Sequence, residues 1–141
     1  MNEAAILFGG VLSATVGVGH CFFYRGFGWK KDFEKTRLLT ARVLYTIHLF
    51  LIPLFLLFAW LSFVHTEELA GATALGRSLS IFYSLFWLAR GIWQVIYFRP
   101  SRISGLEKLL PLHYILIISF VLLCAAYSLP LLNAVDPISM N

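Results

Sequence analysis

Charged residues are confined to short stretches of this chain, and long apolar runs separate those stretches. Residues 4–24, 43–64 and 109–135 contain no Asp, Glu, Lys or Arg, and residues 78–98 contain only Arg90. About 20 helical residues suffice to cross a hydrocarbon core about 30 Å thick. The pattern therefore predicts four transmembrane helices, over residues 4–24, 42–64, 78–98 and 109–133.

The composition of the chain supports this assignment. Hydrophobic residues make up 60% of the 141 residues and charged residues only 13%, whereas about a quarter of the residues of a typical globular protein are charged. Four spans and three short connections account for nearly the whole chain, so we predict a single integral membrane domain over residues 1–141. Because short connections make consecutive helices antiparallel neighbours, we expect an all-α membrane protein: an up-down bundle of four transmembrane helices with short loops.

Small residues form a stripe on the first predicted helix. Gly9, Ser13 and Gly17 recur every four residues and therefore share one helix face. Small residues at this spacing let helix backbones approach each other closely in a membrane. We expect the stripe to pack against neighbouring helices.

The basic residues are distributed unevenly among the predicted loops. Six lie from Arg25 to Arg42 and three from Arg99 to Lys108, whereas the middle loop has only Arg77. Because cytoplasmic loops carry the excess of Lys and Arg, the first and third loops are predicted to be cytoplasmic. Both termini then lie outside, and we expect a multi-pass protein of the plasma membrane, which in a bacterium is the inner membrane.

The first loop also contains Phe27, Trp29 and Phe33 among its basic residues. Basic residues near the cytoplasmic face attract anionic lipids with about 1 kcal/mol each, and aromatic rings favour the interface. We therefore expect the lipid bilayer, with anionic lipids at its cytoplasmic face, to be a partner of the protein. Nucleic acid is not an expected partner despite the net charge of +4, since topology accounts for the basic residues.

Polar side chains from four different spans are predicted to lie at similar depths. At 1.5 Å per helical residue, the three histidines of the spans lie about 7 to 9 Å, and Arg90 about 13 Å, from the nearest charged residue at the cytoplasmic end of the helix. On the third span, two further polar residues follow Arg90 at i+4 and i+7 and share its face. The polar site predicted in the cytoplasmic half consists of His20, His48, Arg90, Gln94, Tyr97 and His113.

Arg90 has no counter-ion in any predicted span. All seven acidic residues lie in predicted loops or tails. An intramembrane charge normally faces the bundle interior and finds a partner there. The partner of Arg90 is therefore expected to be a neutral polar group such as Gln94, a loop carboxylate, water, another subunit, or an anionic ligand or lipid.

Two classes of function are consistent with such a site. In the first, the site binds an anionic ligand. This is either a b-type haem, with His48 and His113 as axial ligands, His20 as the substitute and Arg90 near the propionates, or a small anion or lipid phosphate. A quinone-reducing site is intermediate between the haem site and the anion site. In the second class, the protein is a non-catalytic structural, assembly or anchor subunit, and Arg90 meets a carboxylate of a protein partner or of a second copy.

The sequence leaves the chemistry of the site open. It contains no HExxH motif, no glycine-rich phosphate loop and no acidic residue within a span that could relay protons. Catalytic residues are therefore not assigned, and we expect no metal other than a haem iron. The sequence does not decide whether the protein is an enzyme.

Overall fold

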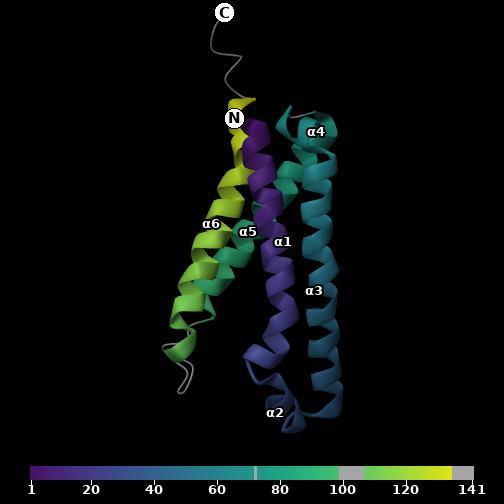
Figure 1. Ribbon diagram of the computed structural model, residues 1–141, viewed down its shortest axis with the longest axis vertical. Coiled ribbons are helices and arrows are strands. Elements are labelled where there is room, and N and C mark those ends of the chain that lie inside the picture. Colours follow the sequence, from purple (N-terminus) through teal and green to yellow (C-terminus); the bar gives the residue numbers. More distant parts are fainter. Residues whose placement is uncertain (72, 99–106, 135–141) are drawn as a thin grey trace, which may run out of the picture.

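The computed structural model describes residues 1–71, 73–98 and 107–134, and these are almost entirely helical, with no strand among them (Figure 1). In chain order the elements are α1 (Asn2–Gly26), α2 (Trp29–Glu34), α3 (Leu38–Val64), α4 (Thr66–Ala70), α5 (Ala74–Ile96), the 3₁₀ helix η2 (Glu107–Leu109) and α6 (Leu110–Asn133). The all-α fold class is confirmed for the described part of the chain.

Four of these helices, α1, α3, α5 and α6, are long and apolar enough to cross a membrane. Their positions agree closely with the four predicted spans. The starts of α3 and α5 differ most, since each lies four residues before the predicted span. At α5, the hydroxyl of Thr73 caps the helix by accepting a hydrogen bond from the Gly76 N–H at 3.1 Å. Such a cap satisfies one of the free donors of a helix N-terminus, so α5 begins before its apolar run.

The connections contain two short helices that the apolar pattern does not predict. Helix α2 lies between α1 and α3 and follows Gly28, whose φ of 68° is left-handed. Glycine adopts this conformation without the strain that a Cβ would cause. Helix α4 lies between α3 and α5, and its Leu69 is fully buried. The first and middle loops are therefore partly folded.

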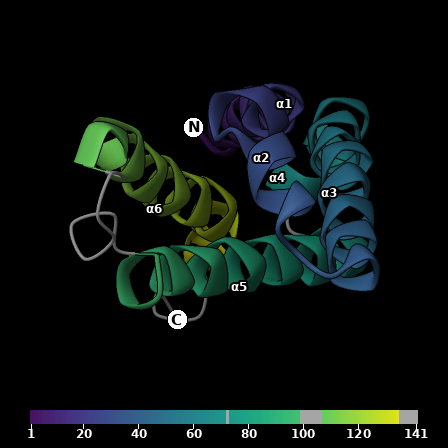
Figure 2. The same ribbon diagram turned by 90° about the horizontal axis from the view of Figure 1, so that it is seen from below.

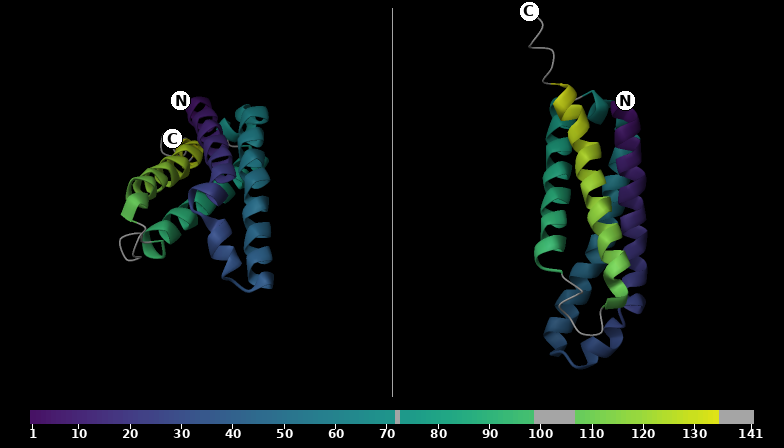
Figure 3. Two further views of the ribbon diagram at one scale, coloured as in Figure 1. Left: turned by 60° about the horizontal axis from the view of Figure 1, so that its bottom comes forward. Right: turned by 90° about the vertical axis from the view of Figure 1, so that its left-hand side faces the viewer.

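The long helices form two antiparallel pairs, α1 with α3 and α5 with α6, and α1 also packs against α6 (Figure 2). The pairs lie together at the end of the molecule that carries the N-terminus and α4. They diverge toward the opposite end, where α2 lies (Figures 1 and 3). We call the first the closed end and the second the open end.

The small residues of α1 lie against the neighbouring helices, as predicted. A Cβ at Gly9 would come 2.9 Å from the Tyr127 ring of α6, and one at Gly17 would come 3.2 Å from Phe55 of α3. Ser13 is fully buried between them. Small residues at such positions let two helix backbones approach each other and pack by van der Waals contact. Close backbone contact is therefore the form of packing that suits these helices.

Tyr127 links three helices at the closed end. Its Oη lies 2.8 Å from Ser62 Oγ on α3 and 3.3 Å from Ser13 Oγ on α1. Ser62 donates its own proton to the carbonyl of Phe58 at 2.7 Å. A hydroxyl has one proton to donate, so Ser13 donates to Tyr127 and Tyr127 donates to Ser62. All three hydroxyls of this Tyr127 cluster are satisfied.

Aromatic side chains join the two helix pairs near the centre of the molecule. Phe55 and Phe58 of α3 contact Trp87 and Tyr83 of α5, with ring centroids 5.4 and 4.5 Å apart. Trp87 in turn stacks on Phe120 of α6 at 5.7 Å. Pairs of this kind contribute about 0.5–1.5 kcal/mol beyond their burial. Tyr83 Oη and Trp87 Nε1 are buried without a hydrogen-bond partner in the described residues, so packing rather than hydrogen bonding positions these rings.

Candidate functional site

A cavity of about 220 Å³ lies between the two helix pairs at the open end, and we call it the Arg90 cavity. Four of its lining side chains are polar: His20 of α1, His48 of α3, and Arg90 and Gln94 of α5. The structure thus brings together four of the six residues predicted to form the site. The remaining lining is apolar or aromatic: Phe23, Phe27, Trp29, Leu51, Phe98, Leu109, Leu112 and Leu116.

Arg90, Gln94 and His113 form a hydrogen-bonded chain on α5 and α6. Arg90 Nη1 donates to Gln94 Oε1 at 2.9 Å, and Gln94 Nε2 lies 3.0 Å from His113 Nδ1. Because a guanidinium only donates, the Gln94 oxygen faces Arg90 and the Gln94 amino group donates to His113. The neutral ring of His113 therefore accepts at Nδ1 and carries its proton on Nε2.

His20 and His48 form a second polar pair, on α1 and α3. His20 Nδ1 donates to the carbonyl of Val16 at 2.8 Å, and His48 Nε2 donates to the carbonyl of His20 at 2.9 Å. A carbonyl only accepts, so the free lone pairs of the neutral rings are on His20 Nε2 and His48 Nδ1. The two rings are stacked with centroids 5.5 Å apart, and Trp29 of α2 meets His48 edge-on at 4.7 Å.

Arg90 has more donors than partners. A guanidinium carries five N–H groups, and one of them bonds to Gln94 within the described residues. The ion pair found in this part of the chain joins His65 and Glu68 near α4, so no described carboxylate neutralises Arg90. The Phe120 ring centroid lies 4.8 Å from the guanidinium carbon. This cation–π contact stabilises the charge and uses none of the N–H groups, so those that find no partner among the described residues can bind an acceptor.

Two residues predicted to belong to the site do not line the cavity. His113 is buried and reaches the site through its bond to Gln94. Tyr97 follows the last residue of α5, is 72% exposed and stacks on Trp93 with ring centroids 4.9 Å apart. The i+7 spacing places Tyr97 near the face of Arg90, but stacking on Trp93 holds its ring away from the cavity.

The aromatic part of the lining is not predicted by the search for polar residues. Phe23 on α1 and Phe27, which follows the last residue of α1, come three and seven residues after His20, and this spacing puts them near the face of His20. That signal was available in the sequence. Trp29 is different, because its approach to His48 depends on the turn at Gly28 and on the fold of α2.

The arrangement gives no support to haem binding. Of the predicted axial pair, His113 has no free lone pair while Gln94 donates to it, and the free nitrogen of His48 is Nδ1. Cavities that hold drug-sized ligands measure about 300–1,000 Å³, which is more than the 220 Å³ of the Arg90 cavity. The described residues also contain no group of three or more His, Cys, Asp or Glu side chains that could hold a metal ion.

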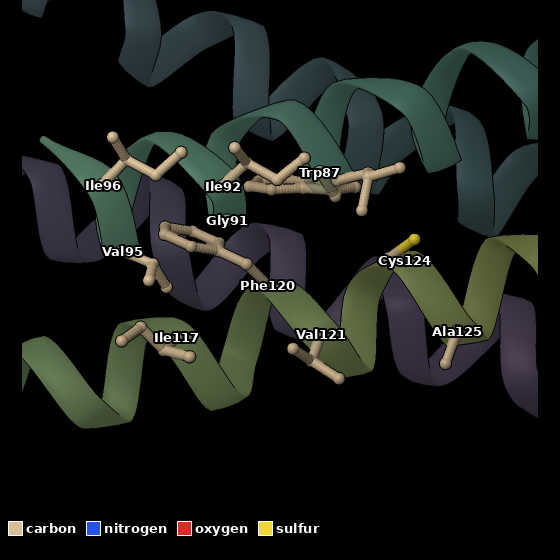
Figure 4. Close-up of a pocket in the computed structure, with 11 residues that line it drawn as sticks. Trp87, Gly91, Ile92, Val95, Ile96, Ile117, Phe120, Val121, Cys124 and Ala125 are labelled. Atoms are coloured by element: carbon tan, nitrogen blue, oxygen red, sulfur yellow. The ribbon is translucent and has the colours of Figure 1, made fainter.

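A larger cavity, of about 590 Å³, lies between α5 and α6 and is lined by apolar side chains and Cys124 (Figure 4). Neighbouring side chains in its lining, such as Leu88, Ile92 and Val121, are exposed, so this cavity opens on the outer surface of the helix pair. It shares no lining residue with the Arg90 cavity. Of these two cavities, only the smaller one is lined by charged or strongly polar side chains.

No protein-family model matches the chain, and no curated protein or solved structure is significantly similar to it.

Proposed function

We propose that the protein is an integral membrane protein in which α1, α3, α5 and α6 cross the plasma membrane as an up-down bundle. The length and hydropathy of the four helices support this, and so do the many large apolar side chains on their outer faces. Contiguous apolar surfaces of this extent are rare on soluble monomers.

The open end is proposed to face the cytoplasm, with both termini outside. The basic residues from Arg25 to Arg42 lie at this end, on and around α2, and the excess of Lys and Arg marks the cytoplasmic side. Arg99 and Arg102, which support the same orientation in the sequence, lie outside the described residues.

Within this bundle, the Arg90 cavity is proposed to bind the anionic group of a ligand, such as a phosphate. One observation carries this function: a guanidinium in a membrane span borders a cavity with N–H donors to spare and no described carboxylate beside it. Arg90 is partly buried and has no described counter-ion, and a charge held away from water without a counter-ion is unfavourable. Phosphate oxygens are suitable partners, because they accept paired N–H groups of a guanidinium. His20 lines the same cavity, and the free lone pair on its Nε2 can accept a hydrogen bond from a protonated phosphate oxygen.

The rival function is a non-catalytic structural or anchor subunit whose Arg90 meets a carboxylate of a partner. The cavity favours the anion, because Phe27, Trp29 and Phe98 line it together with Arg90. A partner helix would have to displace these rings to reach the guanidinium, whereas a small anion would not. The rival predicts a stoichiometric protein partner that copurifies with the chain.

The test is thermal unfolding of the full chain in mild detergent with increasing inorganic phosphate. A ligand at 100 times its Kd stabilises the folded state by about 2.7 kcal/mol, so the wild type should show a saturable rise in Tm. Arg90→Leu should abolish the rise. Arg77→Leu, which removes another arginine of α5, is the matched control and should retain it. An absent response in the wild type, or equal responses in the two variants, contradicts anion binding at Arg90.

The orientation has a separate test. Lys35→Cys and Glu67→Cys are made in a background in which Cys21 and Cys124 are replaced by Ser. A membrane-impermeant thiol reagent added to intact cells should label Glu67→Cys, near α4, and should spare Lys35→Cys. The reverse pattern contradicts the proposed topology.

A further inference from the structure

A third cavity, which is also apolar, adjoins the Arg90 cavity. It has a volume of about 180 Å³ and lies between α1 and α6, and we call it the α1–α6 groove. Phe23, Leu112 and Leu116 line both the groove and the Arg90 cavity, so the two meet at these side chains. The other residues that line the groove are Leu12, Thr15, Val16, Gly19, Ile115 and Ser119.

The polar groups in the groove lining are already satisfied. Thr15 Oγ1 donates to the carbonyl of Val11 at 2.9 Å, and Ser119 Oγ donates to the carbonyl of Ile115 at 2.8 Å. Each hydroxyl thus bonds within its own helix, and the groove presents an apolar wall. Thr15 and Ile115 are exposed, so the groove opens on the outer surface of the bundle. Such a groove suits a hydrocarbon chain.

We propose that the ligand of the Arg90 cavity is an anionic membrane lipid, with its phosphate on Arg90, one segment of an acyl chain in the α1–α6 groove and the rest of the lipid outside the bundle. This inference rests on the proposed anion binding. The Arg90 cavity carries a positive charge, and the adjoining groove is apolar. An anionic lipid has the matching parts, a negatively charged headgroup joined to apolar chains.

The larger cavity on α5 and α6 is the wrong place for this chain. It shares no lining residue with the Arg90 cavity, whereas the α1–α6 groove shares three. The stacked rings of Trp87 and Phe120 form part of its wall. A chain bound there would leave its headgroup on the outer side of these rings and away from the polar site.

The lipid reaches the site sideways, between α1 and α6. A Cβ placed on Gly19 would meet nothing within 4 Å, so the groove is unobstructed on the α1 side. At the α2 side of the Arg90 cavity, the rings of Phe27 and Trp29 contact each other with centroids 6.1 Å apart. A lipid that enters from the bilayer keeps its chain in apolar surroundings and need not pass these rings.

The experiment combines native mass spectrometry of lipid binding with the phosphate response of Tm, both on the full chain in mild detergent. The probes are dioleoyl phosphatidylglycerol and the zwitterionic dioleoyl phosphatidylcholine. Gly19→Leu fills the groove. Gly26→Leu is the matched control. It makes the same change in α1 at a glycine where a Cβ also meets nothing within 4 Å, and Gly26 lines none of the three cavities.

The wild type should bind phosphatidylglycerol in preference to phosphatidylcholine. Gly19→Leu should weaken phosphatidylglycerol binding about tenfold or more, which corresponds to excluding about two methylene groups from the groove. It should keep the response to inorganic phosphate, and Gly26→Leu should keep both. Ser119→Leu fills the groove from α6 and should repeat the result if Gly19→Leu does not fold.

Equal phosphatidylglycerol affinities in the groove-filled variant and in Gly26→Leu overturn the lipid inference, and so does equal binding of the two lipids by the wild type. In both cases a phosphate response that depends on Arg90 leaves the proposed function standing. A wild type without any phosphate response overturns the proposed function itself.

Discussion

The closed and open ends of the molecule both bury polar side chains among apolar helices, but they satisfy these side chains differently. In the Tyr127 cluster, hydrogen bonds run from Ser13 through Tyr127 and Ser62 to a backbone carbonyl, and these three hydroxyls are all satisfied. The neighbouring Tyr83 hydroxyl is buried without a partner in the described residues, but it carries no charge. At the open end, the chain from Arg90 through Gln94 to His113 begins at a guanidinium with donors to spare beside a cavity. The contrast supports the proposal that the first end holds the helices together and the second binds a ligand.

The packing of the two ends follows the same division. Near the closed end, glycines let α1 approach its neighbours so closely that a Cβ at Gly9 or Gly10 would come 2.9 Å from an aromatic ring. At the open end, large aromatic side chains such as Phe23 and Trp29 stand between the helix pairs and line the Arg90 cavity. Small residues therefore close one end, and large residues keep room at the other.

Truncation of Tyr127 should have the largest effect on stability. Tyr127→Ala removes a fully buried ring and leaves two serines short of a partner, so we expect a loss of about 3–5 kcal/mol, as for other large buried aromatic residues. Tyr114→Ala on the same helix, where the ring is 60% exposed, is the control and should cost far less. Unfolding in mixed micelles measures both, and equal losses would show that the cluster does not hold the closed end.

A counter-ion supplied within the protein should abolish anion binding at the open end. Gln94→Glu places a carboxylate where the Gln94 oxygen now accepts from Arg90 at 2.9 Å. Because the guanidinium is then neutralised, the stabilisation of about 2.7 kcal/mol expected at 100 times the wild-type Kd for phosphate should disappear. The stability of the variant without phosphate is measured in parallel, because the carboxylate also removes the donor to His113 Nδ1, and the His113 proton must then move from Nε2 to Nδ1. If the variant still responds fully to phosphate in the same Tm assay, the response does not depend on the charge of Arg90.

Crowding the closed end should have an intermediate effect. Gly9→Leu forces a side chain against Tyr127, which already lies within 2.9 Å of the position of a Cβ, and overpacking of this kind costs about 1–3 kcal/mol. Gly26→Leu is the control, since its Cβ meets nothing within 4 Å. Unfolding free energies of the two variants are compared, and no difference between them would mean that close approach of α1 is not needed.

The smallest effect is expected outside the spans, at Glu68. A hydrogen bond from its own backbone N–H, and a second one from His65, lower the pKa of this carboxyl below its ordinary value. A lowered pKa in the folded state adds stability above the ordinary pKa, and this stability is lost as the pH falls through the folded value. Glu68→Gln should therefore flatten, slightly, the fall in Tm from pH 6 to pH 3. Because Glu68 is solvent-exposed, a large change would contradict this assignment.

The four long helices could be predicted from the sequence, because length and hydropathy alone locate a long apolar helix. The level along these helices at which the polar residues meet could also be predicted, from their positions in the apolar runs. His20, His48, Arg90 and Gln94 line one cavity as a result. The short helices α2 and α4 could not be predicted, since their stability depends on packing against the long helices.

The contacts of His113 and Tyr97, the two predicted site residues that do not line the cavity, also depend on which helices face each other. His113 is held by Gln94 of the neighbouring helix, and Tyr97 stacks on Trp93 instead of turning to the cavity. A helical repeat gives the face on which a residue lies, but it does not give the partner that a side chain finds near the end of a helix.

The most direct test of the central claim is an NMR titration of the Arg90 side chain. Protein labelled with ¹⁵N-arginine is studied in micelles, and Arg90→Lys identifies the Arg90 Nε–H resonance by its loss. Inorganic phosphate should shift this resonance saturably, with the Kd that the Tm response gives, while the resonance of Arg77 shifts little. An Arg90 resonance that does not move, or that shifts no more than that of Arg77, would contradict a phosphate site at Arg90.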